Sequence, residues 1–576
     1  MKRIALLLVV LVVINILASF VHARIDLTKE KRYTLSRASK TILRKLDSDV
    51  DIDVFLKGEF PAQFRKLTNS VEEFLQLLKE SNSSRVKYHF ISPLDEVPGK
   101  PGTKYGDSLM NMGATPINLK AQVKTGESSS LAYPYAIMKY KGREELITLF
   151  TAPPAIGNGE TPEKVINSAE ALLEYQFVKA LDRLTNYKRP GIGYSVGNGE
   201  PVDHRTYDLR LVLSNDYELR TVNLNTGTHV PDSVNLLLIV KPTLAFSEEE
   251  KLKIDQFVMR GGKLLCFIDN LIAERDSLAF KPETIAYDRN LNLTDLFFRY
   301  GLRINTDLVM DLQCDVIPFV IGGSTQNPQI EFLHWNYYPL LMSSDKPIKV
   351  PGYVTGQFVN SIDSIAVPGV VKTPLLVTSA NSRIISTPAL ISLNENKNTP
   401  EDEKFKRDAI PAAMLLEGTF TSLFRNRLSK AQSDTLAAAG ENFQSNSVPN
   451  KMIVVADGDI VLNDYVPSNG PNAAPEPLPM GWNKYTYTEY IKESQNGQLF
   501  IPAANRDFLL NCIEYLVSSP AIAETRNKEI VLRMLDPVKV KQQKSTWQMI
   551  NIAAPILLVI LAGWFYQEYR KKVYSQ

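Results

Sequence analysis

The sequence predicts an α/β protein with a transmembrane helix at each end. Strands alternate with helices over two long stretches, the pattern of sheets covered by helices. Some predicted strands, such as VNLLLIV at 234–240, are continuous apolar runs, as in strands buried on both faces. Apolar segments also lie near both ends of the chain, at 4–20 and 549–566. The long middle part is therefore expected to be an exported region between two membrane anchors.

The C-terminal segment has the length and the flanks of a membrane helix. Residues 549–566 carry no charge, and the segment from Trp547 spans roughly 30 Å as a helix, the thickness of a bilayer's hydrocarbon core. Aromatic residues lie at both of its ends and basic residues follow at once, as at the cytoplasmic side of a membrane. We expect residues 547–569 to span the membrane and 570–576 to form a cytoplasmic tail.

The N-terminal segment has two interpretations. Two basic residues precede an apolar run at 4–20, and the VHA that follows resembles the cleavage site of a signal peptide. The run is longer than the core of a signal peptide and long enough to cross a membrane, so we favour an uncleaved anchor over 1–23. Either interpretation exports the chain after Arg24. With both short basic ends in the cytoplasm, the bulk of the chain is predicted to be periplasmic.

The composition excludes several classes of function. Lys and Arg number 65 against 63 Asp and Glu, a balance that predicts no nucleic-acid partner. The three cysteines and five histidines show no metal-ligand spacing, so we expect neither a metal nor another cofactor. The sequence contains no G-x-x-x-x-G-K-[ST] loop, so this chain is not itself the ATPase of a transport system.

The first exported stretch alternates strands and helices in the order β-α-β-α-β-β. VDIDVFLKG at 50–58 alternates polar and apolar residues like a half-buried strand, and a helix with regularly spaced apolar residues follows at 61–80. The remaining elements are VKYHFISP, a short helix near 105–112, PINLKAQV and YAIMKYKG. This order matches a thioredoxin-like fold. No cysteine lies near the end of the first strand, so we expect the fold without its redox chemistry.

A second α/β unit begins at Pro190. The strand VNLLLIV is followed by a helix that Ser247 caps, and Gly261-Gly262 end this helix before another buried strand, KLLCFID. This pattern stops near Asn270 and returns at KMIVVADGD, which begins at Lys451. Strands alternating with helices predict a parallel, doubly wound sheet. The intervening residues are rich in short β stretches and are interpreted as an insertion.

These boundaries give a predicted domain organisation. Its parts are a membrane anchor (1–23), a thioredoxin-like domain (24–150), a linker helix (151–189), a doubly wound domain in two pieces (190–270 and 450–520), a β-rich insertion (271–449), a juxtamembrane connector (521–546), a membrane helix (547–569) and a cytoplasmic tail (570–576).

Two loops at the ends of predicted strands are candidate ligand-binding sites. The candidate residues are Gly197, Asn198, Gly199 and Glu200 after GIGYSV, and Asp457 and Asp459 after KMIVVA. Ligands bind outside the carboxyl ends of parallel strands, so either loop is placed to bind a small molecule. The glycines lack the G-x-G-x-x-G spacing of a phosphate loop. The aspartate pair either holds a cation or forms a tight turn with exposed acids, and we favour the turn.

GYSVG at 193–197 matches the G-x-S-x-G motif of hydrolases, which would make Ser195 a nucleophile. In that motif the serine lies on a sharp turn that opens a helix, whereas Ser195 lies in or at the end of a short strand. We therefore expect no catalytic residue. An α/β hydrolase or small-ligand sensor, using Ser195 or the aspartate pair, is the alternative function.

Each membrane segment contains an amide near its outer end. Asn15 lies roughly 7 Å and Asn551 roughly 6 Å inside that end, so the two lie at similar depth when both termini are cytoplasmic. An unpaired amide in hydrocarbon is costly, so we expect these residues to pair with each other or to face a permease. Alternatively, each amide reaches interfacial water.

Several stretches together resemble one family. They are RIDLTKEKRYTLS after the first membrane segment, EFPAQFRKL, VKYHFISP, NLLLIV with GGKLLCFID, and the C-terminal anchor. This set resembles the gliding-associated ABC transporter auxiliary proteins, the GldG family, over essentially the whole chain, and RIDLT…RYTLS is its most specific piece.

The resemblance implies a non-catalytic inner-membrane subunit in gliding bacteria. Its partners would be a separate polytopic permease and, through it, a cytoplasmic ATPase, and it would act on cargo or envelope components. The resemblance also implies a glutamine-amidotransferase-like middle domain, here without the cysteine nucleophile of that fold.

Overall fold

The computed structural model describes much of the chain. The described residues are 26, 34–112, 114, 116–123, 126–150, 163–186, 189–279, 281–324, 327–344, 347–348, 350, 352–393, 402–438, 442–466, 474–487, 503–517, 525 and 537–574. The predicted N-terminal anchor, with Asn15, lies outside them. The chain divides into two compact units, Met1–Lys528 and Glu529–Gln576.

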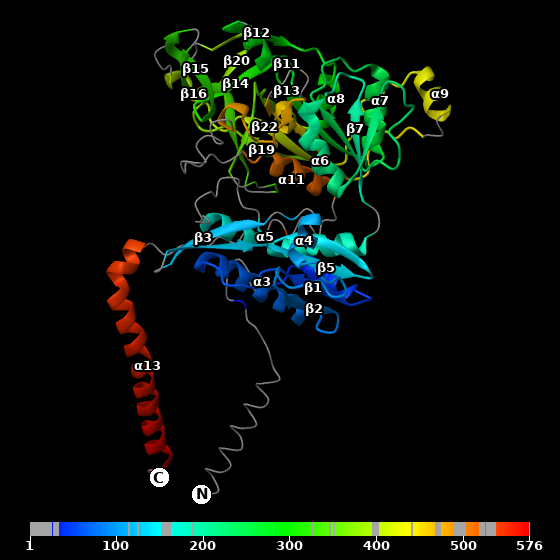
Figure 1. The fold of residues 1–576 in the computed structure, drawn as a ribbon. Coiled ribbons are helices and arrows are strands. Elements are labelled where there is room, and N and C mark those ends of the chain that lie inside the picture. The colour runs from blue at the N-terminus through cyan, green and yellow to red at the C-terminus, as the bar shows by residue number, and fades with distance from the viewer. Residues whose placement is uncertain are drawn as a thin grey trace. The chain divides into compact units, whose positions relative to one another are not determined.

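A four-stranded sheet is the centre of the N-terminal region. Its strands are β1 (Val50–Val54), β2 (Val86–Phe90), β5 (Tyr135–Tyr140) and β6 (Arg143–Thr148), in the order β2-β1-β5-β6. Figure 1 labels the first three of them. β1 is parallel to β2 and antiparallel to β5, which pairs antiparallel with β6. The helices of this region are α2 (Arg37–Arg44), α3 (Ala62–Ser81), α4 (Tyr105–Asn111) and α5 (Glu163–Thr185).

One apolar core joins this sheet to α2, α3 and α5. α3 places Phe64, Leu67 and Leu75 in it at helical spacing, and α5 adds Phe177 and Leu181. The helix predicted as a linker is therefore packed on the N-terminal sheet.

The structure corrects one strand of the predicted series. PINLKAQV forms β3 (Ile117–Val123), which pairs with β4 (Gly126–Ala132) in a separate hairpin, and β6 completes the sheet instead. Pairing with the nearest segment along the chain costs the least loop-closure entropy, and alternation alone does not reveal the partner.

The middle region is built on a large mixed sheet in the order β15-β16-β19-β22-β23-β10-β9-β7-β8. The neighbours β8 (Glu218–Asn223), β7 (Gly191–Val196), β9 (Leu236–Val240), β10 (Lys263–Phe267) and β23 (Asn450–Val455) run parallel. Beyond β23 the strands β22 (Pro411–Gly418), β19 (Val370–Val377), β16 (Asn327–Ser343) and β15 (Cys314–Ser324) pair antiparallel. Strands of the predicted insertion therefore extend the same sheet.

Smaller strands surround this sheet. They are β11 (Leu271–Ile272), β12 (Glu283–Asp288) and β21 (Ala389–Ser392) in one sheet, the pairs β13 (Leu302–Ile304) with β18 (Ile362–Ser364), β14 (Asp307–Asp311) with β20 (Ser382–Ser386) and β24 (Tyr465–Val466) with β25 (Glu476–Pro477), and β17 (Tyr353–Thr355) beside β16.

Apolar cores on both faces of the parallel strands are closed by helices. On β9, Leu236 and Leu238 belong to one core and Leu237 and Ile239 to the other, as the two-residue period of a strand requires. α6 (Tyr207–Asp216) and α11 (Asn505–Val517) pack into the first core, and α7 (Glu248–Met259) and α8 (Thr294–Tyr300) into the second. In α9 (Lys430–Ala438), the side chains that the structure describes, those of residues 430–434, are mostly exposed.

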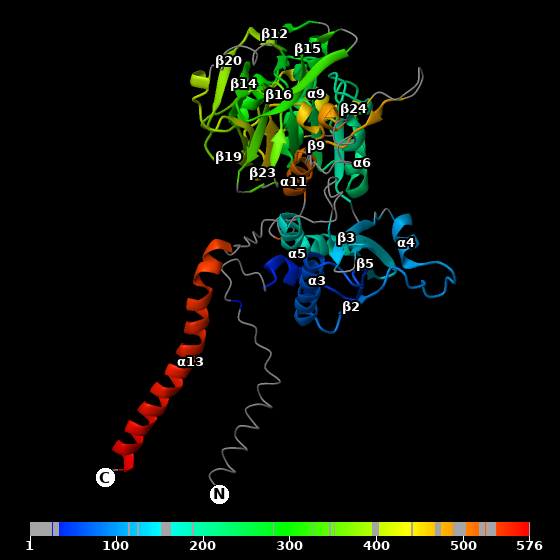
Figure 2. The same ribbon diagram turned by 60° about the vertical axis from the view of Figure 1, so that its left-hand side comes forward.

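The second unit contains the helix α13 (Pro537–Tyr574), which is continuous in Figures 1 and 2. Its part Gln543–Val573 is long and apolar enough to cross a membrane, and its most apolar 18 residues have a mean hydropathy of 2.0. This part contains the predicted span and Asn551. The helix begins at Pro537, so the last ten residues of the predicted connector are helical too. At 1.5 Å per residue, α13 is roughly 57 Å long, more than a bilayer core requires.

Candidate functional site

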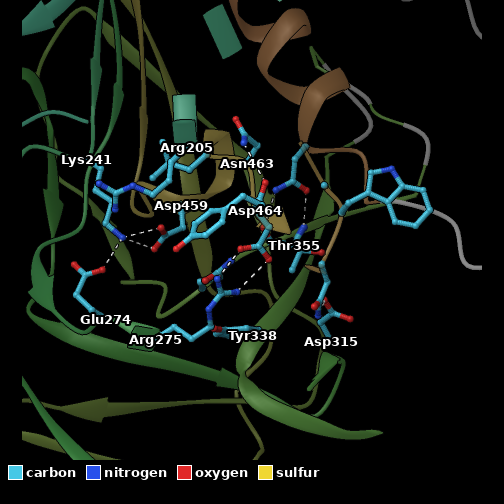
Figure 3. Close-up of a pocket in the computed structure, with 17 residues that line it drawn as sticks. Arg205, Lys241, Glu274, Arg275, Asp315, Tyr338, Thr355, Asp459, Asn463 and Asp464 are labelled. Carbon is cyan, nitrogen blue, oxygen red and sulfur yellow. Dashed lines mark hydrogen bonds and ion pairs between the residues drawn. The ribbon is translucent and has the colours of Figure 1, made fainter. Parts of the chain in front are cut away.

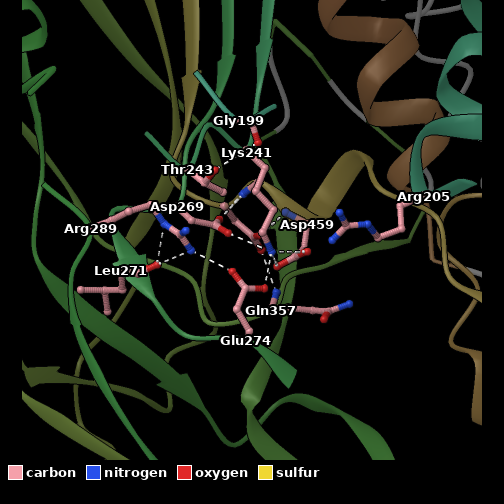
Figure 4. A network of polar contacts seen from close by, with 12 residues as sticks. Gly199, Arg205, Lys241, Thr243, Asp269, Leu271, Glu274, Arg289, Gln357 and Asp459 are labelled. Atoms are coloured by element: carbon pink, nitrogen blue, oxygen red, sulfur yellow. Dashed lines mark hydrogen bonds and ion pairs between the residues drawn. The ribbon is translucent and has the colours of Figure 1, made fainter. Parts of the chain in front are cut away.

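Acidic side chains surround a lysine at the carboxyl ends of the parallel strands (Figure 4). Lys241 follows β9, Asp269 follows β10, and Asp459 follows β23. The Nζ atom of Lys241 lies 2.7 Å from both carboxylate oxygens of Asp459 and 3.1 Å from an oxygen of Asp269. It also lies 3.1 Å from Glu274, which contacts Arg289 at 2.8 Å. Only 5% of the Lys241 side chain is exposed, so its ion pairs with Asp269 and Asp459 are buried, whereas Glu274 is 37% exposed.

The backbone holds this lysine in an unusual conformation. Lys241 has a φ angle of 42°, which non-glycine residues rarely adopt, and its N–H donates to the carbonyl of Phe267 at 2.8 Å. Gly458 packs directly against it, because a Cβ atom at position 458 would lie 2.6 Å from the Cβ of Lys241. The close approach of the loops after β9 and β23 therefore requires glycine at 458 and directs the lysine toward the acids.

Backbone N–H groups fix the carboxylates from behind. The fully buried Asp457 accepts hydrogen bonds from the N–H groups of Gln357 (2.7 Å) and Asp459 (2.8 Å). Asp269 accepts one from the N–H of Gly458. The orientation of the acids is thus set by the loops and not by solvent.

Burial and mutual repulsion shift the titration of the cluster. Burial raises the pKa of Asp459 to about 6; Lys241 opposes this shift, while Asp269 and Glu274 add to it. Burial, followed by the charge of Asp269, also raises the pKa of Asp457. Burial alone would lower the pKa of Lys241, but the surrounding carboxylates hold it well above its usual value. The lysine therefore stays charged, while Asp459 titrates just below neutrality.

The carboxylates also have the spacing of a cation site. Asp269, Asp457 and Asp459 each offer an oxygen within 4.8 Å of the others. The ammonium group of Lys241 contacts two of these three residues, so the chain itself supplies a positive charge at this place. We interpret the cluster as a buried ion-pair network rather than a metal centre.

A cavity of about 80 Å³ lies beside the cluster (Figure 3). Lys241, Glu274 and Asp459 form part of its wall. The other lining residues are Arg205, Arg275, Asp315, Tyr338, Thr355, Gln357, Leu462, Asn463, Asp464, Tyr465, Gly481, Trp482, Asn483 and Asn505. The cavity is thus bounded by both charged and aromatic side chains.

The tyrosine in this wall has an unused polar group. Tyr338 is 1% exposed, and its ring packs edge-on against Trp335 and Phe358, with centroids 4.9 and 5.6 Å away. Its hydroxyl has no hydrogen-bond partner among the residues that the structure describes. Buried hydroxyls are normally paired, so this one is an exception among the residues that the structure describes.

The predicted site residues are only partly brought together. Asp459 lines the cavity and Asp457 supports it from behind, whereas the loop at 197–200 does not belong to the lining. In that loop Glu200 accepts hydrogen bonds from the Asn198 N–H and from the Ser195 hydroxyl, both at 2.8 Å. A Cβ at Gly199, whose φ is 78°, would lie 2.0 Å from the Thr243 hydroxyl oxygen. The Glu200 carboxylate is thus used within the fold, whereas the buried Oδ1 of Asn198 accepts no hydrogen bond from the described residues. The role of this loop in ligand binding stays a prediction.

The sequence analysis missed Lys241, Asp269 and Tyr338. Lys241 and Asp269 directly follow buried apolar strands, as Asp457 and Asp459 do. A search for polar residues after such strands would therefore have found them too. Tyr338 lies within the long strand β16, where no local pattern distinguishes it from a core residue.

Comparisons with known proteins give a family. A model of the family described as an ABC-type uncharacterized transport system matches residues 189–512, and a model of a domain of unknown function matches 29–139. An uncharacterized protein from Borreliella burgdorferi is 22% identical over 464 residues, which are 78% of this chain and 80% of that protein.

Two solved structures show only weak similarity. The mmIFT52 N-terminal domain matches with a TM-score of 0.27 and 11% identity, over 54% of this chain and all of that one. The exo-beta-1,4-mannosidase Op5Man5 from Opitutaceae bacterium strain TAV5 matches with a TM-score of 0.18 and 9% identity, over 58% and 38%. Neither score establishes a common fold. The family match at 189–512, in contrast, covers more than half of the sequence, and the chain therefore belongs to the family of ABC-type uncharacterized transport systems.

Proposed function

We propose that this chain is a non-catalytic, membrane-anchored auxiliary subunit of an ABC transporter whose permease and ATPase are separate chains. The family match at 189–512 carries the proposal, and α13 supports the anchor. The sequence has no ATP-binding loop, and a chain with one or two membrane helices does not enclose a transport path. The partners must therefore supply both the energy and the pore.

Co-purification tests this proposal. The tagged full-length chain, extracted in mild detergent, is expected to bring down a polytopic permease and an ATPase that carries the missing loop. A variant that ends at residue 536 lacks α13 and should lose both. Recovery of the full-length chain alone, or ATP hydrolysis by this chain without partners, would contradict the proposal.

The finer details rest on the basic ends and on the resemblance to the GldG family. We place both termini in the cytoplasm, the bulk of the chain in the periplasm and the complex in a gliding apparatus. A cysteine at Lys572 should be shielded from an impermeant thiol reagent in intact cells, and one at the exposed Asn290 should react once the outer membrane is permeabilised. The reverse labelling would refute this topology, and normal gliding after gene deletion would refute the link to motility.

The non-catalytic role is supported by the environment of Ser195. Its side chain is fully buried and donates to Glu200, so the hydroxyl is unavailable to a substrate. Ser195→Ala is expected to lose about 1 kcal/mol of stability and to keep complex formation and the cellular phenotype. Loss of function in a variant that still folds and reaches the membrane would favour the hydrolase alternative.

For the membrane helices we propose that Asn551 of α13 pairs with Asn15 or with a permease helix. An amide within the apolar stretch of α13 supports this, because interhelical hydrogen bonds contribute roughly 0.6–2 kcal/mol in lipid. Cysteines at the two positions should cross-link to each other or to the permease. Labelling of both by a lipid-phase probe without any cross-link would refute the pairing.

For the domain folds we propose a thioredoxin-like N-terminal domain and a doubly wound, glutamine-amidotransferase-like middle domain. The order β2-β1-β5-β6, with a parallel first pair, supports the former. The parallel neighbours from β8 to β23 support the latter.

A further inference from the structure

We propose that the cavity beside Lys241 binds a small organic cation, namely a protonated primary amine whose ammonium group contacts the carboxylate of Asp315. Asp315 lies in β15 and lines the cavity, and it forms no ion pair with any residue that the structure describes. The cavity also lies beside the carboxyl ends of β9 and β23, the edge at which parallel sheets bind ligands. The inference goes beyond the proposed transporter role and does not depend on which proteins the chain joins.

The hydrogen bonds of Asp315 leave room for a further donor. Its carboxylate accepts from the side-chain amide of Asn483 at 3.1 Å and from the N–H of Val316 at 2.8 Å. A carboxylate has about four acceptor sites, so about two remain. Burial raises the pKa of Asp315, and the hydrogen bond from Asn483 opposes this shift only in part. The charged form of Asp315 would therefore be stabilised by a cation in the cavity.

The other lining carboxylates, in contrast, each contact a cation of the chain. The pairs are Asp464–Arg275 at 2.6 Å, Asp459–Lys241 at 2.7 Å and Glu274–Lys241 at 3.1 Å. The third lining cation, Arg205, pairs at 2.9 Å with Asp203, which lies outside the lining. Figure 3 shows Asp315 across the cavity from Lys241.

The lining therefore carries an excess of negative charge, with four carboxylates against three cations. A cationic ligand would balance this excess, whereas an anion would add to it. A neutral ligand would leave Asp315 without a cation.

The surroundings of Asp315 favour an ammonium ion over a metal ion. Among the described residues, the acids with the spacing of a metal site are Asp269, Asp457 and Asp459, and Asp315 is not one of them. A metal ion needs several such ligands together, whereas an ammonium group can bind one carboxylate. The cavity of about 80 Å³ has room for about five to eight water molecules, which suits a short amine. The ring of Trp482 offers apolar surface for its carbon chain.

Calorimetric titration of the full-length chain tests the inference. The chain is kept in maltoside detergent and cacodylate buffer at pH 7, because Tris and some phospholipid head groups are themselves amines. Three probes share a four-carbon chain and differ in charge: n-butylamine is positive, n-butanol is neutral and butyrate is negative. Putrescine adds a second ammonium group, and Mg²⁺ is the inorganic cation. We expect saturable binding of n-butylamine or putrescine and no binding of the other three probes.

Two aspartates provide matched variants. Asp315→Asn removes the charge and keeps the size of the side chain, so it should weaken amine binding by about tenfold or more. It should not lower the melting temperature, because the carboxylate that it removes has no cation beside it. Asp363 lies outside the lining and pairs with Arg303 at 2.8 Å, so Asp363→Asn should leave the affinity unchanged.

Three results would overturn the inference. The first is that neither amine binds, or that n-butanol or butyrate binds as tightly as the amines, a comparison that needs no variant. The second is that Mg²⁺ binds to wild type and not to Asp315→Asn, which would make the site one for metal ions. The third is that the amines bind equally well to wild type and to Asp315→Asn, which would place their site elsewhere.

Discussion

At the scale of single residues, Lys241 is the cation of the acidic cluster and forms three ion pairs. Asp269, Glu274 and Asp459 all contact its ammonium group within 3.1 Å. Lys241→Met would leave these carboxylates without a positive charge beside them. Removing one partner of a buried ion pair destabilises the folded state by about 3–5 kcal/mol. We expect a loss of that size in the unfolding free energy of the middle region, measured by denaturant titration.

The exposed Lys430 on α9 provides the control, because Lys430→Met should change stability by less than about 0.5 kcal/mol. The double variant Lys241→Met with Asp459→Asn should recover part of the loss, since it also removes one of the stranded charges. Equal stability of Lys241→Met and wild type would contradict the ion-pair network.

Asp459 makes a pH-dependent contribution with a definite sign. Its pKa is raised in the fold to about 6, so the folded state binds more protons than the unfolded state between about pH 4 and 6. Its contribution to stability therefore falls as the pH rises through this window. The variant Asp459→Asn lacks this titrating group, so its unfolding free energy should not show this fall. As the pH rises from 4 to 6, the variant should therefore gain stability relative to wild type.

Thermal melting of both proteins at several pH values measures this difference. Asp434 is exposed on α9, and the variant Asp434→Asn serves as the control. It should leave the dependence of the melting temperature on pH nearly unchanged. A difference that is independent of pH, or that grows in favour of wild type with rising pH, would show that the pKa of Asp459 is not raised.

Among the elements, α7 is closed at its start by a reciprocal capping box. The hydroxyl of Ser247 accepts from the N–H of Glu250 at 3.3 Å, and the Glu250 carboxylate accepts from the N–H of Ser247 at 2.8 Å. The same carboxylate accepts from the Asn198 amide at 3.0 Å, so the cap also ties α7 to the loop after β7. Ser247→Ala should lower the unfolding free energy by about 1 kcal/mol.

A similar cap on another helix makes the comparison sharp. Ser429 accepts from the N–H of Gln432 at 3.2 Å at the start of α9. Because the described side chains at the start of α9 are mostly exposed, Ser429→Ala should fray that end of the helix without lowering global stability. Equal losses in the two variants would show that α9 unfolds together with the sheet.

For the whole molecule, the division into two compact units predicts that the first folds without the second. A chain ending at Lys528 omits α13, and the cores described here lie entirely before that residue. We expect its melting temperature to match that of the full chain within about 2 °C. A loss of a few kcal/mol in unfolding free energy would lower the melting temperature by more than this. A large drop in scanning calorimetry would mean that α13 stabilises the first unit. Removal of residues 1–23 as well should release the chain from the membrane.

The sequence by itself determined the properties that depend on neighbours along the chain. Continuous apolar runs predicted the buried strands β9 and β10, Ser247 with Gly261-Gly262 predicted the bounds of α7, and eighteen uncharged residues predicted the membrane helix. Each is a local pattern of hydrophobicity or capping that a single element satisfies alone.

Only the tertiary structure decided which strands pair and which side chains meet. Lys241 and Asp459 are 218 residues apart, and they meet because β10 alone separates β9 from β23 in the sheet. An apolar strand can be buried next to any other apolar strand. Its sequence pattern therefore predicts that it is buried but not which strands lie beside it. Two features depend on this order and on packing between distant segments: the ammonium group among the acids and the unpartnered hydroxyl of Tyr338. No local pattern specifies them, just as alternation did not specify that β3 pairs with β4.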